Sequence, residues 1–233
     1  MALDSTSRAG SVALVEDGRV VEERAGDALR THGERLPGEL AALGVAWSSV
    51  DVFAVTAGPG SFTGLRIGIA TIQGLALVNR RPAVGVSALE AVAQLASRDL
   101  GEGETVAAWI DAQRGEVFSA LYRITAQPVF TPERLIELEA PAVATPVLTM
   151  SAWGRHDLAS TTFAGDGAAR HAASTANDGA IMQLARPALL AGAVGCMAAV
   201  RAGRGLATTP DAIRPLYIRR PDAEIHRQRQ ATR

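Results

Sequence analysis

Lysine is missing from the 233-residue sequence, and all 23 basic residues are arginine. The chain therefore has no phosphate-loop lysine, no Schiff-base lysine and no lysine general base. Its one cysteine, Cys196, excludes an intrachain disulfide. The four histidines, His32, His156, His171 and His226, are too far apart in sequence to form a local metal-ligand pair. These absences predict a protein of the reducing cytoplasm that has no metal site.

An excess charge of one sign and a long apolar run are also lacking. The 23 basic and 24 acidic residues leave a net charge of -1, so no overall field draws the chain to nucleic acid or to an anionic membrane. The N-terminus has no apolar signal core, and the longest weakly polar run, 187–200, is too short to span a bilayer. We expect a soluble, cytoplasmic protein that does not associate with membranes.

The hydrophobic pattern predicts alternating strands and helices. The chain opens with β-hairpins around "EDGR", and later segments predict a helix over 32–43, a strand over 51–56, a helix over 63–80, a strand at "PAVGVS" and a helix from Ser87 to about Arg98. Beyond "GEGE" we expect a hairpin formed by "TVAAWI" and "EVFSALYRI", strands near 146–150 and 161–164, and a helix over 187–202. This order predicts an α/β fold. We place an N-terminal lobe at 1–102, a smaller lobe at 103–217 and a flexible Arg-rich tail at 218–233.

The glycine loop in "VTAGPGSFTGLRIGIA" (55–70) resembles a phosphate-binding loop but fails each test of one. A Walker loop needs a lysine, and the dinucleotide fingerprint needs a glycine spacing one residue shorter than Gly58-x-Gly60-x-x-x-Gly64. A hydrolase elbow needs glycines two residues to either side of Ser61. We interpret Ser61 as a helix N-cap.

The helix that follows has two apolar faces and one narrow polar line, formed by Arg66, Gln73 and Arg80. Such a helix has to be covered on two sides. Gly64 and Gly68, four residues apart, predict a backbone notch where another helix can approach closely. One hypothesis is a central core helix, and the other is that one face packs on the sheet while the second binds a partner protein.

Several stretches together resemble the TsaB (YeaZ) family: "ALDSTS", "GPGSFTGLRIGIATIQGLAL", "VGVSALEA", "IDAQRGEVF" and "PLYIRR". The resemblance runs in order along the whole chain. It implies the actin-like, sugar kinase and Hsp70 ATPase fold, which is ribonuclease H-like, with two lobes of which the second is reduced. It also implies a subunit required to make N6-threonylcarbamoyladenosine beside the tRNA anticodon, in which TsaD transfers the threonylcarbamoyl group and the ATPase TsaE joins the complex.

The resemblance implies that this subunit is not an enzyme, has no cofactor of its own and reaches tRNA only through the complex. TsaD-like proteins carry metal-binding histidines at the positions of Ala88 and Val92, and neither of these residues can ligate a metal. ATP is expected, if anywhere, at the interface with TsaD. The residues at the end of the first strand, Asp4, Ser5, Thr6 and Ser7, either form a vestigial nucleotide site or only close a hairpin turn. "FAGDGA" (163–168) is either a remnant glycine-rich loop or a turn.

The resemblance further implies that the helices at 32–43 and 63–80 pack against TsaD, or against a second copy of the chain when TsaD is absent. The candidate partner-binding residues are His32, Leu36, Leu40, Leu43, Gly64, Arg66, Ile67, Gly68, Thr71 and Gly74. We expect a bulky charged residue at Gly68 to abolish TsaD binding while the monomer stays folded.

Three alternatives remain open. A peptidase would have to assemble Ser61, His32 and Asp51, which no motif links. An ATP-dependent small-molecule kinase of the same fold would need intact phosphate and adenosine loops. Direct tRNA binding would use the arginines near the C-terminus, which are Arg214, Arg219, Arg220, Arg227, Arg229 and Arg233.

Overall fold

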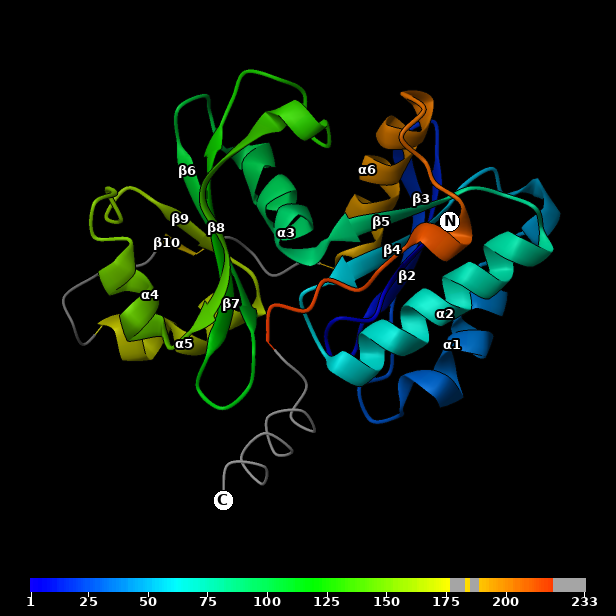
Figure 1. Ribbon diagram of the computed structural model, residues 1–233, viewed down its shortest axis with the longest axis horizontal. Coiled ribbons are helices and arrows are strands. Elements are labelled where there is room, and N and C mark those ends of the chain that lie inside the picture. The colour runs from blue at the N-terminus through cyan, green and yellow to red at the C-terminus, as the bar shows by residue number, and fades with distance from the viewer. Residues whose placement is uncertain (177–182, 185–188, 220–233) are drawn as a thin grey trace.

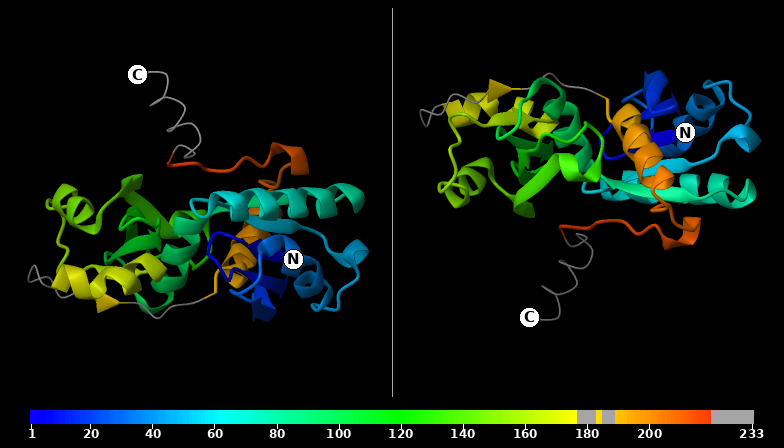
Figure 2. Two further views of the ribbon diagram at one scale, coloured as in Figure 1. Left: turned by 90° about the horizontal axis from the view of Figure 1, so that it is seen from below. Right: turned by 90° about the horizontal axis from the view of Figure 1, so that it is seen from above.

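The chain folds into two lobes, each built on a five-stranded sheet (Figure 1). The computed structural model describes residues 1–176, 183–184 and 189–219. The first sheet has the order β3-β2-β1-β4-β5 and the second has the order β10-β9-β6-β7-β8. Helices pack on both faces of each sheet, which confirms the predicted α/β class (Figure 2).

The first sheet combines β1 (Ala2–Asp4), β2 (Ser11–Glu16), β3 (Arg19–Ala25), β4 (Phe53–Gly58) and β5 (Ala83–Ser87). The strands β1, β2 and β3 are antiparallel neighbours, whereas β1, β4 and β5 run parallel. Successive side chains point to opposite faces of the sheet. Leu3 and Val55 therefore pack with α1 (His32–Ala41) and α2 (Phe62–Val78), while Ala2 and Ala54 pack with α6 (Ala191–Gly203).

The second sheet combines β6 (Thr105–Asp111), β7 (Val117–Ile124), β8 (Leu135–Ala144), β9 (Thr162–Ala164) and β10 (Gln183–Leu184). Its one face packs on α3 (Ala88–Ala96). The other face carries α4 (Pro146–Ala152) and α5 (Asp166–Ala176) around the buried Trp109, whose ring lies 5.1 Å from Phe163 and 6.2 Å from Trp153. Short 3-10 turns, η1 (Trp47–Ser49), η2 (Ser97–Asp99), η3 (Pro132–Arg134) and η4 (Pro210–Ala212), complete the described structure.

Local sequence signals set most element boundaries. Ser61 caps α2 and Ser87 caps α3, each accepting a hydrogen bond from a backbone N–H of the first turn, as predicted. The strand expected near 146–150 is wrong, because that segment is the helix α4. Thr145 caps this helix by accepting from the Leu148 N–H, and Pro146 occupies the first turn, where its missing N–H costs nothing.

Helices on either side of residues 102 and 103 pack on the opposite lobe, and the boundary predicted there stays a prediction. α3 precedes that boundary and packs on the second sheet, whereas α6 follows it and packs on the first sheet. Residues 208–217 also return to the first lobe, where Thr208 bridges to Ala83 of β5. Of the predicted tail, Ile218 and Arg219 are placed against the second lobe, and 220–233 lie outside the described residues.

Candidate partner-binding face and its glycine loop

The glycine loop joins β4 to α2, and its glycines make room for other parts of the same chain. A side-chain carbon on Gly60 would stand 2.5 Å from Thr6, and the backbone N–H of Ser61 donates to the Thr6 carbonyl at 2.8 Å. A side-chain carbon on Gly64 would stand 2.1 Å from the Ser5 carbonyl oxygen, and one on Gly68 would stand 2.0 Å from the Ser5 Oγ. The loop at residues 5–6 therefore fills the space beside these three glycines.

This packing corrects the interpretation of the Gly64 and Gly68 notch. Both glycines are buried, and the notch is closed by Ser5 and His32 of this chain. A bulky charged residue at Gly68 would collide with Ser5 inside the lobe. We therefore now expect such a variant to lose stability as well as partner binding.

The candidate vestigial nucleotide site is turned inward. Asp4 is 2% exposed, and its Oδ1 accepts from the Thr6 N–H at 3.0 Å, from the Thr6 hydroxyl at 2.6 Å and from the Thr56 hydroxyl at 2.8 Å. Ser5 and Thr6 are buried as well, and the Ser7 Oγ accepts from the Gly10 N–H. The Asp4 Oδ1 is thus committed to three donors of its own lobe, and the nucleotide role of this segment stays a prediction.

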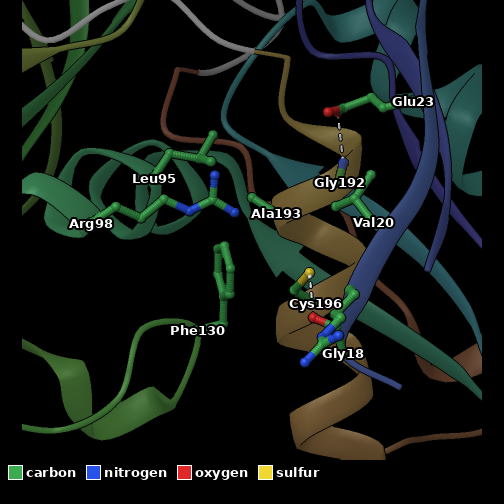
Figure 3. Close-up of a pocket in the computed structure, with 10 residues that line it drawn as sticks. Gly18, Val20, Glu23, Leu95, Arg98, Phe130, Gly192, Ala193 and Cys196 are labelled. Carbon is green, nitrogen blue, oxygen red and sulfur yellow. Dashed lines mark hydrogen bonds between the residues drawn. The ribbon is translucent and has the colours of Figure 1, made fainter. Parts of the chain in front are cut away.

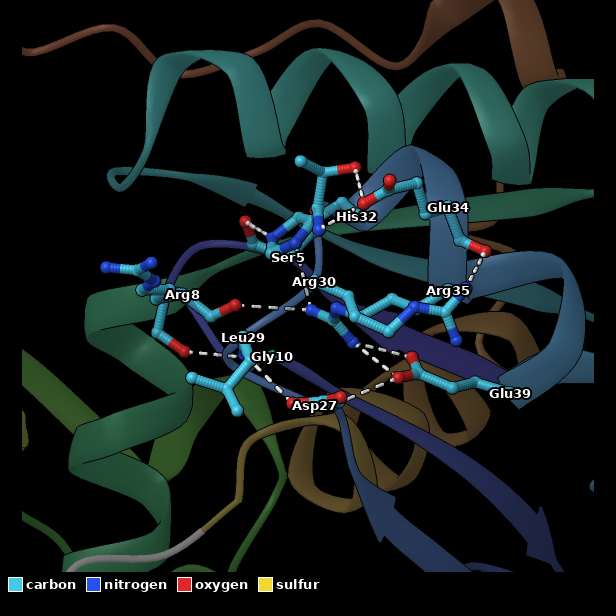
Figure 4. A network of polar contacts seen from close by, with 12 residues as sticks. Ser5, Arg8, Gly10, Asp27, Leu29, Arg30, His32, Glu34, Arg35 and Glu39 are labelled. Atoms are coloured by element: carbon cyan, nitrogen blue, oxygen red, sulfur yellow. Dashed lines mark hydrogen bonds and ion pairs between the residues drawn. The ribbon is translucent and has the colours of Figure 1, made fainter.

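A buried polar network holds the loop at residue 5 against α1 (Figure 4). Arg35 donates from Nη1 to both Glu39 oxygens at 2.6 and 2.7 Å and from Nη2 to His32 Nδ1 at 2.9 Å. An arginine only donates, so His32 Nδ1 accepts. His32 Nε2 then carries the proton and donates to the Ser5 carbonyl at 3.0 Å. Thr31 and Glu34 form a capping box at the start of the same helix.

This network leaves the peptidase alternative without a base. Both ring nitrogens of His32 are engaged, and the Ser61 hydroxyl caps α2 by accepting from the Gly64 N–H at 3.3 Å. Asp51 precedes β4 whereas Ser61 follows it, and a six-residue strand is about 20 Å long. The three residues are not brought together as a triad.

The predicted residues on α1, and Leu43 in the turn that follows it, belong to the core. Leu36, Leu40 and Leu43 are 2%, 4% and 5% exposed and pack in the cluster that includes Ile69 and Ile72 of α2. His32 is buried too. These four residues hold the two helices together inside the lobe, which corrects the expectation that they contact a partner directly.

The predicted residues on α2 divide between core and surface. Arg66 and Gly74 are exposed, Ile67 and Thr71 are half-buried, and the space beside Gly74 is open. Three further exposed residues extend this stripe: Ala70 and Leu77, which the 3.6-residue period already places on the second apolar face of the helix, and Val78, which the prediction missed. Leu77 is 70% exposed and Val78 is 81% exposed. We call the stripe formed by Ile67, Ala70, Thr71, Gly74, Leu77 and Val78 the free face of α2.

The polar line along α2 is covered by the C-terminal part of the described chain. Gln73 Nε2 donates to the carbonyls of Pro210 and Ile213 at 3.0 and 3.3 Å, and Arg66 Nε donates to the Tyr217 hydroxyl at 3.1 Å. The free face of α2 therefore lies between this segment on one side and the α1 side of the helix on the other. Nothing in the local pattern of 210–217 signals that it docks on a helix some 140 residues earlier.

The stretch "FAGDGA" forms the junction between β9 and α5. Asp166 begins α5, and its Oδ1 accepts from the backbone N–H of Asp111, while Arg170 of the same helix pairs with the Asp111 carboxylate at 2.8 Å. The segment ties α5 to the end of β6, so a strand-to-helix junction describes it better than an isolated turn.

In the part of the chain that the structure describes, His, Cys, Asp and Glu side chains do not gather in groups of three that could hold a metal ion. Among the same residues, we find no helix with both the length and the apolar composition that crossing a lipid bilayer requires.

Two sheets with helices on both faces, joined into two lobes, define the class of the protein: it has an actin-like, two-lobed ATPase-type fold. A solved structure described as an uncharacterized protein with similarity to peptidase YEAZ from Pseudomonas aeruginosa shares this fold, with a TM-score of 0.72 and 31% identity over 94% of this chain and 98% of that chain. YeaZ from Pseudomonas aeruginosa has a TM-score of 0.67 and 31% identity, over 93% of this chain and 97% of that one.

Sequence comparisons place the chain within this class. The family model described as TsaD, tRNA N6-adenosine threonylcarbamoyltransferase, matches residues 26–227. The tRNA threonylcarbamoyladenosine biosynthesis protein TsaB of Escherichia coli is 41% identical over 135 residues, which are 53% of this chain and 54% of that protein, about half its length. An uncharacterized protein of Mycobacterium bovis is 31% identical over 96% of this chain and 93% of its own. The chain belongs to the TsaB/YeaZ family.

Proposed function

We propose that this chain is a non-catalytic subunit needed to form N6-threonylcarbamoyladenosine in tRNA, and that it binds a TsaD-type transferase through the free face of α2. The name of the Escherichia coli relative supports the pathway. In this proposal TsaE joins the complex, the chain pairs with a second copy when TsaD is absent, and tRNA is reached only through the complex. A role in tRNA modification also implies that the protein is located in the cytoplasm.

The observation that carries the proposal is the apolar surface of α2. Ala70, Gly74 and Leu77 are spaced four and three residues apart, so they lie on one side of the helix. All three are exposed, and Gly74 has open space where a side chain would stand. Small residues beside exposed Leu77 and Val78 form a surface on which a partner helix can pack closely and bury apolar area.

Other features favour a supporting role over catalysis. Ala88 and Val92, which align with the metal-binding histidines of TsaD-like proteins, are apolar residues buried between α3 and the second sheet. Asp4 is committed to Thr6 and Thr56. If ATP is part of the working complex, we place it at the junction with TsaD rather than in a site made by this chain alone.

The proposal is tested by placing a charge in the middle of the free face. Ala70 is exposed, so Ala70→Arg keeps the fold while a long charged side chain blocks helix packing. Ala169→Arg is the matched control, because Ala169 is an exposed helical alanine on α5 of the other lobe. Titration calorimetry with TsaD, and tRNA modification by TsaD and TsaE with each variant, provide the readouts. Loss of both for Ala70→Arg alone supports the proposal, and equal binding by the two variants contradicts it.

A further inference from the structure

The "PLYIRR" stretch crosses from one lobe to the other, and we call its residues 215–219 the clasp. At the first lobe the Leu216 N–H donates to the Ala57 carbonyl at 2.6 Å. The ring of Tyr217 lies 5.1 Å from that of Phe62, and the guanidinium of Arg66 stacks 4.1 Å from the same Phe62 ring. Backbone pairing and ring stacking together fix the clasp on the glycine loop and on α2.

At the second lobe, the next two residues are anchored on different elements. Ile218 packs against the apolar cluster between α3 and the second sheet. Arg219 donates from Nη1 to the Ala112 carbonyl at 2.8 Å and pairs through Nη2 with Glu116, both on the hairpin that joins β6 to β7. Consecutive residues of the clasp thus bind α2 and this hairpin, which belong to separate lobes.

The junction between the lobes combines an apolar contact, in which Ala91 and Leu95 of α3 pack with α6, and a pocket beside it. A pocket of about 370 Å³ separates β3 and α6 of the first lobe from the α3 end and Phe130 of the second (Figure 3). Arg98 lies over the Phe130 ring, 4.9 Å from its centre, at the wall of this pocket. The exposed Arg204–Glu133 ion pair also crosses the junction, and exposed pairs contribute little. The ion pair between Arg201 of α6 and Glu90 of α3 also crosses the junction and is less exposed.

We infer that the clasp fixes the angle between the lobes and forms one side of the partner-binding face, so that a TsaD-type partner on α2 binds the clasped form. This inference rests on the proposed function. Tyr217 is still 37% exposed and lies against Phe62 and Arg66, beside the free face. A helix packed on α2 would then contact the clasp as well, and its binding energy would favour the conformation in which the clasp is seated.

The test separates the angle between the lobes from partner binding. Spin labels on Asp51→Cys and Val147→Cys, two exposed sites in different lobes, report the interlobe distance in a Cys196→Ser background. Arg219→Ala removes the second-lobe anchor of the clasp. Arg214→Ala is the matched control, because the carbonyls that Arg214 contacts, those of Asp211 and Ile213, lie in its own segment. Thermal unfolding verifies that each variant is folded.

We expect Arg219→Ala to broaden the interlobe distance distribution and to weaken TsaD binding roughly tenfold, and Arg214→Ala to change neither. The charge-swapped pair Arg219→Glu with Glu116→Arg should restore part of both. An unchanged distance distribution in Arg219→Ala overturns the inference that the clasp fixes the angle between the lobes. A broadened distribution with unchanged affinity for TsaD overturns the inferred link between the clasp and partner binding. If Ala70→Arg binds normally, the proposed docking on α2 fails, while the distance measurement on the isolated chain still decides whether the clasp holds the lobes.

Discussion

The backbone carbonyl of Leu216 lies over Gly58, at 2.6 Å from where a side-chain carbon on residue 58 would stand. Gly58 also has a φ of +119°, which side-chain-bearing residues rarely adopt. The first glycine of the loop is therefore required by a segment near the other end of the chain. The contact links the glycine loop, which resembles a phosphate-binding loop, to the clasp.

We predict that Gly58→Ala destabilises the protein by roughly 1–3 kcal/mol and displaces the clasp, because the methyl group adds a steric clash to an unfavourable φ. Chemical denaturation gives the stability, and hydrogen exchange of the amide of Leu216 reports whether its bond to Ala57 persists. Gly74→Ala is the control. Gly74 sits in an exposed helix interior with open space beside it, so alanine should be neutral or stabilise by about 0.5–1 kcal/mol.

The contact between Ser5 and Gly68 predicts two opposite effects. Gly68→Ala should destabilise the fold, because the new carbon would stand 2.0 Å from the Ser5 Oγ. Ser5→Ala should be neutral or slightly stabilising, since this buried hydroxyl has no hydrogen-bond partner among the residues that the structure describes. The double variant should be more stable than Gly68→Ala alone, which urea unfolding of all four proteins measures as a coupling energy. Additive effects would show that the two residues do not compete for the same space.

We predict that breaking the ion pair between Arg35 and Glu39 lowers the free energy of unfolding more than replacing both residues with apolar ones. Arg35 is 3% exposed, and Glu39→Ala leaves its charge buried without a carboxylate, which should cost about 3 kcal/mol. Arg35→Met with Glu39→Leu removes both charges and should lose less. Thermal unfolding at matched pH compares the two. A larger loss for the double replacement would mean that the polar network itself, through His32 and Ser5, supplies the stability.

We predict that the carboxyl group of Glu23 makes the stability of the fold depend on pH. Burial raises the pKa of Glu23 above its ordinary value, although the Gly192 N–H, at 2.7 Å, favours the charged form. A carboxyl with a raised pKa in the folded state contributes most to stability below its unfolded pKa, and this contribution is lost as the pH rises through the folded pKa. Glu23→Gln keeps an acceptor for Gly192 and removes the charge. It should flatten the fall in unfolding midpoint from mildly acidic to neutral pH, and an identical pH profile would contradict this.

The local structure was largely predictable from the sequence. The alternation of apolar residues predicted the hairpins and the β4-α2-β5 order, and Ser61 and Ser87 indicated the starts of α2 and α3. These signals depend on neighbouring residues, so they can be read without the fold. The helix at α4 was missed because a seven-residue apolar segment looks the same in a strand and in a helix, and the cap at Thr145 was overlooked.

The candidate site was only partly predictable, because the missing information is long-range. Periodicity showed that α2 has two apolar faces, but it did not show that residues 5–6 fill the space beside Gly64 and Gly68. The same small residues suit a partner helix or the chain's own loop. Periodicity places Ile67, Ala70, Gly74 and Leu77 on one apolar face, but whether that face stays uncovered depends on where α1, the sheet and residues 210–217 lie around α2.

The late position of α6 in the chain has a consequence for biosynthesis. The face of the first sheet that contains Ala2, Ala54, Val84 and Val86 is covered by a helix that begins at Ala191. While the ribosome works through the residues between β5 and α6, this apolar surface lacks the helix that covers most of it, and only α3 and Phe130 can pack against it. We therefore expect the first lobe to complete its folding only near the end of translation, and the nascent protein to depend on chaperones until then.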